Sequence, residues 1–203
     1  MVTDHQLAAL CYATEFTPVT WAFEGPTFHA TATVDADEVV IACQGSKSLY
    51  DWIKDLEAAP VPASHQALGL IHAGFNETTD ECWPAIVEFC KGKIITLTGH
   101  SKGGAEAEML AAKLEAAGVP VALLVTFGTP RWVFAGNGKP TALLAPIPGR
   151  SYRHFKDIVT EVPFEPLWQH AANRTPIEIG TGTPLQMLDV LWMHHIASYE
   201  AVL

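Results

Sequence analysis

The sequence is poor in positive charge. Only 12 Lys and Arg residues stand against 22 Asp and Glu residues, which gives a formal net charge of −10. Such a surface repels a phosphate backbone, and no basic run offsets it, so we expect no nucleic-acid partner. No apolar stretch approaches the roughly 20 residues that span a bilayer, so no transmembrane segment is predicted. Residues 1–5 lack the basic and apolar regions of a signal peptide, which favours a cytoplasmic location, or a secreted one if a leader has been removed.

Cysteine and cofactor motifs are also scarce. The chain has 4 cysteines and no C-x-x-C pair. Cys82 and Cys90 would lie ~12 Å apart on one helix, too far for a disulfide, so free buried thiols in a reducing compartment are predicted. The sequence contains no H-E-x-x-H, no phosphate-binding loop and no dinucleotide-binding glycine motif. We therefore expect neither a metal nor a cofactor.

What the chain does have is a core large enough for one domain spanning residues 1–203. Hydrophobic residues make up 49% of the 203 positions. Residues 94–98 and 121–127 are apolar on both faces, which is typical of parallel strands covered by helices on both sides. The segment between them, residues 102–117, has helical spacing, so the order strand, helix, strand predicts an α/β fold. We expect the charged residues of that helix to lie opposite its apolar face: Glu106, Glu108, Lys113 and Glu115.

One motif carries chemistry. Gly99, Ser101 and Gly103 fit G-x-S-x-G, the sharp strand-to-helix turn of the α/β-hydrolases. This turn lifts a serine above the edge of the sheet, at the positive end of a helix. A serine becomes a good nucleophile only beside a base that a carboxylate orients. The motif therefore predicts that Ser101 is the nucleophile of a Ser-Asp/Glu-His triad.

In this fold the acid and then the histidine follow the serine along the chain. Asp157 falls where the strand predicted near residues 150–157 should end, with Glu161 as the alternative acid. Beyond Asp157, the candidates for the base are His170, His194 and His195.

Several segments resemble the class 3 lipases, the fungal-lipase-like branch of the α/β-hydrolases, and they occur in that family's order. These segments are Val40–Ser46, Ser48–Leu56, His72–Phe75, Thr98–Gly104, Thr126–Arg131, Lys156–Val159 with Pro163, and His195 with Tyr199. Gln44 replaces the family's usual Arg, and Lys102 replaces its usual Leu. The resemblance implies Ser101 as nucleophile, Asp157 as acid and His195 as base. It also implies an oxyanion hole built from the backbone N–H groups of Ser46 and Lys102.

His195 is preferred to His194 on spacing. Residues 185–203 are predicted to be mostly helical, and adjacent residues of a helix point ~100° apart, so both histidines cannot reach Ser101. Tyr199 lies four residues after His195, on the same predicted helical face. His170 could serve only if the loop after Pro166 folds back over the site.

Residues 48–56 form a short amphipathic pattern, with Leu49, Trp52, Ile53 and Leu56 on one side. In the family a helix at this place covers the serine, so these four residues are predicted to form a lid. An ordinary surface helix is the alternative.

The resemblance implies a serine carboxylic-ester hydrolase, either a lipase or an esterase, that acts on an ester or lipid substrate and contacts a lipid interface transiently. Phospholipase A1 or feruloyl esterase activity on the same scaffold is an alternative. A catalytically silent, lipid-binding scaffold is another. The sequence does not indicate the oligomeric state, the acyl chain length or the natural alcohol.

Overall fold

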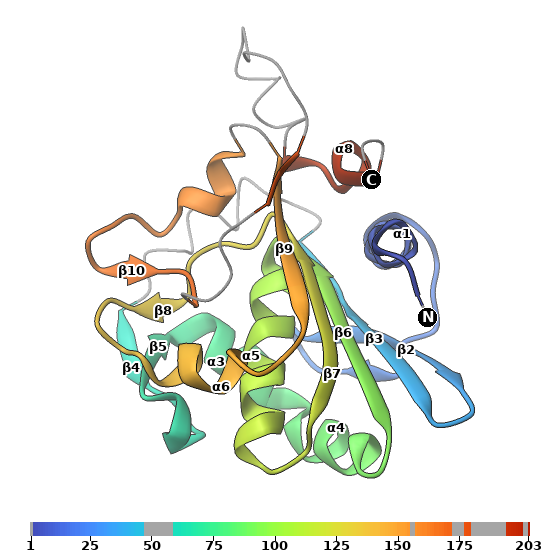
Figure 1. Ribbon diagram of the computed structural model, residues 1–203, viewed down its shortest axis with the longest axis horizontal. Helices are drawn as coiled ribbons and strands as arrows, with labels where there is room; N and C mark the ends of the chain where they lie inside the picture. The colour runs from blue at the N-terminus through green and yellow to red at the C-terminus, as the bar shows by residue number, and fades with distance from the viewer. Residues whose placement is uncertain (1, 47–58, 155–156, 172–176, 180–193, 201–202) are drawn as a thin grey trace, which may run out of the picture.

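The computed structural model describes residues 2–46, 59–154, 157–171, 177–179, 194–200 and 203 (Figure 1). The predicted lid residues Leu49, Trp52, Ile53 and Leu56 lie outside this part of the chain. None of the described helices is long and apolar enough to cross a membrane.

A seven-stranded sheet forms the centre of the fold, with the strand order β1-β2-β3-β6-β7-β9-β11. In this sheet β3, β6, β7, β9 and β11 pair in parallel, and β1 and β2 extend one edge in antiparallel fashion. Their bounds are Phe23–Glu24, His29–Asp35, Glu38–Cys43, Ile94–His100, Val121–Phe127, Gly149–His154 and Ile177–Ile179. The mostly parallel α/β sheet predicted from the apolar runs is confirmed.

Helices cover both faces of this sheet (Figure 1). Helix α1 (Asp4–Phe16) packs on β3, β6 and β7, and it also contacts α8 (Ile196–Glu200). Its first turn is closed by a capping box between Thr3 and Gln6. Helix α5 (Lys102–Ala116) packs on the other face, against the same three strands. Each face thereby buries its own hydrophobic cluster.

A second layer lies outside α5. It contains α3 (Ala73–Glu81), α6 (Lys139–Leu144) and the 3-10 helix η1 (Gln66–Leu68), which all contact α5, and α4 (Trp83–Cys90), which packs on α3. A small sheet of order β10-β8-β5-β4 belongs to this half of the molecule (Figure 1). Its strands are Trp168–Gln169, Val133–Phe134, Leu70–His72 and Pro60–Pro62. The sequence analysis did not predict this sheet.

The second layer overturns one prediction about α5. Glu106, Glu108 and Lys113 were expected on a face away from the core, yet all three are buried. The helix is enclosed on both sides, so its charged side chains find partners inside the protein. Lys113 Nζ lies 2.6 Å from Asp80 Oδ1, and Trp132 Nε1 donates to Glu108 Oε2 at 2.7 Å.

Candidate active site

Ser101 sits at the turn between β6 and α5, at the carboxyl edge of the parallel sheet. Its backbone is in the left-handed region, with φ 55°, and its N–H donates to the carbonyl oxygen of Phe127 at 2.9 Å. A Cβ atom on Gly103 would lie 2.3 Å from the carbonyl oxygen of Cys43, so only glycine lets α5 start this close to the end of β3. The turn predicted from G-x-S-x-G is confirmed, and it brings the backbone of Cys43 and Gln44 beside the start of α5.

Ser101 hydrogen-bonds to His194. The Oγ of Ser101 lies 2.8 Å from Nε2 of His194, and both side chains are buried. The other ring nitrogen, Nδ1, lies 3.0 and 2.9 Å from the two carboxylate oxygens of Asp157. In this arrangement Nδ1 donates its hydrogen to Asp157, which leaves Nε2 free to accept the proton of the serine hydroxyl.

The prediction that His195 pairs with Ser101 is wrong. It assumed one helix running through residues 195–199, whereas α8 begins only at Ile196 and His195 lies at a bend before it. The ring of His195 stacks on Phe16 of α1, with 4.7 Å between ring centroids, and its Nδ1 accepts the N–H of Ala197 at 3.2 Å. The neighbouring residue therefore takes the place next to the serine.

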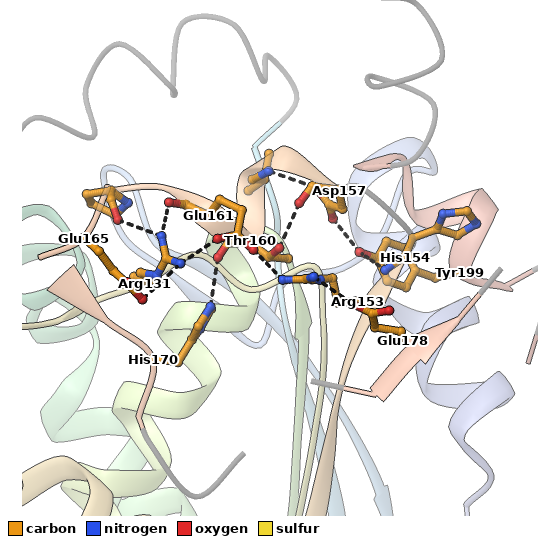
Figure 2. A network of polar contacts seen from close by, with 12 residues as sticks. Arg131, Arg153, His154, Asp157, Thr160, Glu161, Glu165, His170, Glu178 and Tyr199 are labelled. Atoms are coloured by element: carbon orange, nitrogen blue, oxygen red, sulfur yellow. Dashed lines mark hydrogen bonds and ion pairs between the residues drawn. The ribbon is translucent and has the colours of Figure 1, made fainter. Parts of the chain in front are cut away.

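His170, the third candidate, does not reach the serine. Its Nε2 binds the carbonyl oxygen of Thr160 at 2.8 Å, on the loop that carries Asp157 (Figure 2).

Asp157 is held by several donors. The residue is only 1% exposed, and it caps the 3-10 helix η2 (Ile158–Glu161) by accepting the N–H of Val159 at 2.9 Å. The hydroxyl of Tyr199 donates to Oδ2 of Asp157 and accepts the N–H of His154 at 2.9 Å (Figure 2). Burial, and then the charge of Asp157, raise the pKa of Tyr199 well above its usual value. The phenol therefore keeps its proton and remains a donor to the carboxylate.

Two arginines fix the loop after Asp157 (Figure 2). Arg131 lies 2.6 Å from Glu161 Oε2 and 3.5 Å from Glu165 Oε1. Arg153 also binds Glu161, and it lies 2.7 Å from Glu178 on β11. Glu161, the alternative acid, is therefore engaged by two guanidinium groups, while Asp157 faces the histidine.

Of the two residues predicted to form the oxyanion hole, Lys102 follows the serine directly along the chain, and Ser46 follows the end of β3. Lys102 is the first residue of α5, where backbone N–H groups have no partner within the helix. Ser46 follows β3, three residues after the Cys43 carbonyl that contacts Gly103. The side chain of Lys102 binds the carbonyl oxygen of Thr27 at 2.8 Å and Glu106 Oε1 at 2.9 Å.

The described residues include no group of three or more His, Cys, Asp or Glu side chains placed to hold a metal ion. The polar groups gathered at the sheet edge suit proton transfer and nucleophilic attack.

A serine on a strand-to-helix turn, hydrogen-bonded to a histidine above a mostly parallel sheet covered by helices, is typical of an α/β-hydrolase. The sequence model of the family "Lipase (class 3)" matches residues 40–167. The chain therefore belongs to the class 3 lipase family, a family of carboxylic-ester hydrolases, and the resemblance predicted from the sequence motifs is confirmed.

Solved structures share the fold at low sequence identity. The triacylglyceride lipase of Rhizomucor miehei is 20% identical with a TM-score of 0.64, over 83% of this chain and 79% of that one. A triacylglycerol lipase whose catalytic centre is described as a serine protease triad is 23% identical with a TM-score of 0.66, over 82% and 74%.

The chain spans 64% of the length of a Rhizomucor miehei lipase deletion mutant solved as a propeptide complex. The two are 21% identical with a TM-score of 0.63, over 80% of this chain. None of the curated protein sequences matches this chain significantly.

Proposed function

We propose that the protein hydrolyses carboxylic esters through an acyl-enzyme on Ser101, with His194 as the general base and Asp157 as the acid that orients it. One observation supports this above all. A continuous hydrogen-bonded path runs from Ser101 Oγ through both nitrogens of His194 to the carboxylate of Asp157. Chains of this kind activate a serine on several unrelated folds.

In the proposed mechanism Ser101 attacks the ester carbonyl while His194 Nε2 takes the hydroxyl proton. The imidazolium that forms is stabilised by Asp157, and it then protonates the leaving alcohol. Water, activated by the same nitrogen, attacks the acyl-enzyme and releases the acid. The backbone N–H groups of Ser46 and Lys102 stabilise the oxyanion, and losing one such donor typically costs ~3 kcal/mol.

We propose a lipid ester as the substrate class. The Rhizomucor miehei relative is named a triacylglyceride lipase. Three large apolar side chains shortly after Asp157 are exposed, namely Ile158, Phe164 and Leu167. Exposed apolar side chains on the segment that follows Asp157 favour contact with a substrate that has an apolar chain. Rates on p-nitrophenyl esters of increasing chain length test this point, because a preference for the shortest ester would indicate an esterase.

The serine mechanism is tested by Ser101→Ala. A small turn residue replaces another, so the variant should fold with an unchanged unfolding transition and lose turnover by about 10⁵-fold or more. A fluorophosphonate probe should label the wild-type protein at Ser101 and leave the variant unlabelled. A catalytically silent scaffold would instead leave the wild-type protein unlabelled, and a variant with more than a few per cent of the activity would contradict the mechanism.

A further inference from the structure

A second buried pair lies behind the nucleophile and takes no part in the proposed proton transfers. His100, the last residue of β6, precedes Ser101, and its Nδ1 lies 2.8 Å from Oε1 of Glu15. Glu15 comes from the last turn of α1, on the far side of the sheet from α5. The two side chains are only 3% and 4% exposed.

The other nitrogen of His100 contacts the residue that pairs with the serine. Nε2 of His100 lies 2.6 Å from the backbone carbonyl oxygen of His194, and the two rings lie 4.7 Å apart between centroids. A carbonyl oxygen only accepts hydrogen bonds, so Nε2 must carry a hydrogen. Nδ1 lies beside a carboxyl oxygen of Glu15, so a hydrogen on Nδ1 would be donated to that oxygen.

Both ring nitrogens of His100 therefore face oxygen atoms, an arrangement that stabilises the imidazolium form. Burial alone would lower the pKa of His100, but Glu15 outweighs it and the pKa lies above the usual value. The other ionisable groups that face His100 are Asp157 after β9, His194 and His195 before α8, and Tyr199 on α8. Only Glu15 is described in contact with Nδ1.

We propose that Glu15 and His100 form a positioning pair. Glu15 orients the His100 ring, and His100 hydrogen-bonds to the His194 backbone carbonyl, which keeps the His194 imidazole at hydrogen-bonding distance from Ser101. The inference rests on the proposed roles of Ser101 and His194. Neither member of the pair touches substrate in this scheme. Each acts through the backbone of the base.

The end of α1 also contacts the segment that leads to Ser46. A Cβ atom on Gly45 would lie 2.3 Å from Oε1 of Glu15, so the carboxylate rests directly against that backbone. One residue earlier, Gln44 Nε2 donates to the carbonyl oxygen of Thr14 at 2.8 Å. One helix end therefore connects the base, the residue before the nucleophile and the segment that supplies the predicted oxyanion donor.

Two amide substitutions separate the two hydrogen bonds of His100. The amide nitrogen of Gln can occupy the place of Nε2, so His100→Gln keeps the donor to the His194 carbonyl. The amide of Asn reaches only to the place of Nδ1. His100→Asn therefore keeps the contact with Glu15 and loses the hydrogen bond to the His194 carbonyl. Both variants lose the ring and bury an amide.

The measurements are kcat and KM on a soluble p-nitrophenyl ester, well below the unfolding temperature of each variant. His100→Asn should lower kcat by about 10- to 100-fold with KM nearly unchanged, because a small misplacement of a catalytic group has effects of this size. His100→Gln should stay within a few fold of the wild type. His29→Asn, on β2, is the control and should change neither constant.

A matched pair at Glu15 repeats the test if a His100 variant fails to fold. In Glu15→Gln the amide can donate to Nδ1 of a neutral His100, which leaves the Nε2 hydrogen for His194, so kcat should be retained. Glu15→Leu offers His100 no partner and should lower kcat by about tenfold.

Equal kcat for His100→Asn and His100→Gln, or for the two Glu15 variants, would overturn the positioning role. Fluorophosphonate labelling of Ser101 would continue in that case, so the proposed serine mechanism would stand. Activity that survives in Ser101→Ala would instead remove the proposed function itself.

Discussion

Two adjacent histidines face different partners although they share one peptide bond. His194 lies between Ser101 and Asp157, and His195 stacks on Phe16. His194→Ala should therefore lower kcat by at least about 10³-fold, since removal of a triad member has effects of this order. His195→Ala should leave most of the activity. The p-nitrophenyl ester assay checks both, and the reverse pattern would restore the assignment made from spacing.

A second residue-scale prediction concerns Tyr199, which donates to Asp157 and accepts from the backbone of His154. Tyr199→Phe leaves the buried N–H of His154 without this acceptor, which should cost about 1–3 kcal/mol in the free energy of unfolding. Asp157 keeps its hydrogen bonds with the Val159 N–H and with His194. The loss of kcat should therefore be far smaller than the ~10⁴-fold loss expected for Asp157→Asn. Urea unfolding and ester hydrolysis measure the two effects, and Tyr12→Phe on α1 is the control. A loss of kcat as large as that of Asp157→Asn would contradict the supporting role.

The sequence motifs predicted correctly where Ser101 and Asp157 lie, because each follows a recognisable strand. The choice between His194 and His195 failed because spacing cannot show where a helix begins, and one residue of offset exchanges the two rings. Glu15 was missed, although a signal existed. It follows Leu7 and Cys11 at intervals of four, so it is a carboxylate on the apolar face of an amphipathic helix.

At the scale of the element, α5 provides a test of buried charge. Asp80→Ala removes the carboxylate beside the fully buried amine of Lys113 and should cost about 3–5 kcal/mol of unfolding free energy. Lys113→Met removes the buried cation and leaves Asp80, 35% exposed, with Ser64 and solvent, so it should cost much less. The double variant should recover stability relative to Asp80→Ala.

Lys91→Met is the matched control, because that amine pairs with Glu88 at the surface and should stay within about 0.5 kcal/mol of the wild type. Urea unfolding gives all four values. Equal losses for Asp80→Ala and Lys113→Met would show that the charge is not the cause.

The same helix shows the limit of sequence patterns for elements. The long strands and α5 itself could be predicted, because apolar runs and helix stop signals lie within the segment that they describe. Whether the polar face of a helix meets water depends on what else covers it. Here η1, α3 and α6 do so, although they come from chain segments on both sides of α5. The small sheet escaped prediction because its strands have only two or three residues, too few for alternation to appear.

At the scale of the whole molecule, we predict that stability falls on both sides of the mildly acidic range. The pKa of Glu81 is lowered below its usual 4.5, because donors on Thr27 and Phe28 outweigh burial. Its contribution is present above pH 4.5 and is lost as the pH falls through the lowered pKa. The pKa of His100 is raised above 6.5, so its contribution is full below pH 6.5 and is lost as the pH rises through the raised value.

The free energy of unfolding in urea, measured from about pH 3 to about pH 9, checks this profile. Glu81→Gln should flatten the acid side and Glu15→Gln the alkaline side, while each leaves the other side unchanged. An alkaline side that Glu15→Gln does not alter would mean that another group controls it.

The burial of the four cysteines determines how the native protein reacts with thiol reagents. All are free and buried, and burial raises the pKa of Cys11 to about 12 and that of Cys90 to about 11. Cys11 belongs to α1 and Cys43 to β3, while Cys82 and Cys90 bracket α4. Cys11, Cys43 and Cys90 are fully enclosed, so a thiol reagent can reach each of these sulfurs only after its own element has moved away from the core. The rate at which Cys11 of the native protein reacts with such a reagent therefore reports the opening of α1. The rate at which Cys90 reacts reports the opening of α4, in the opposite layer, separately.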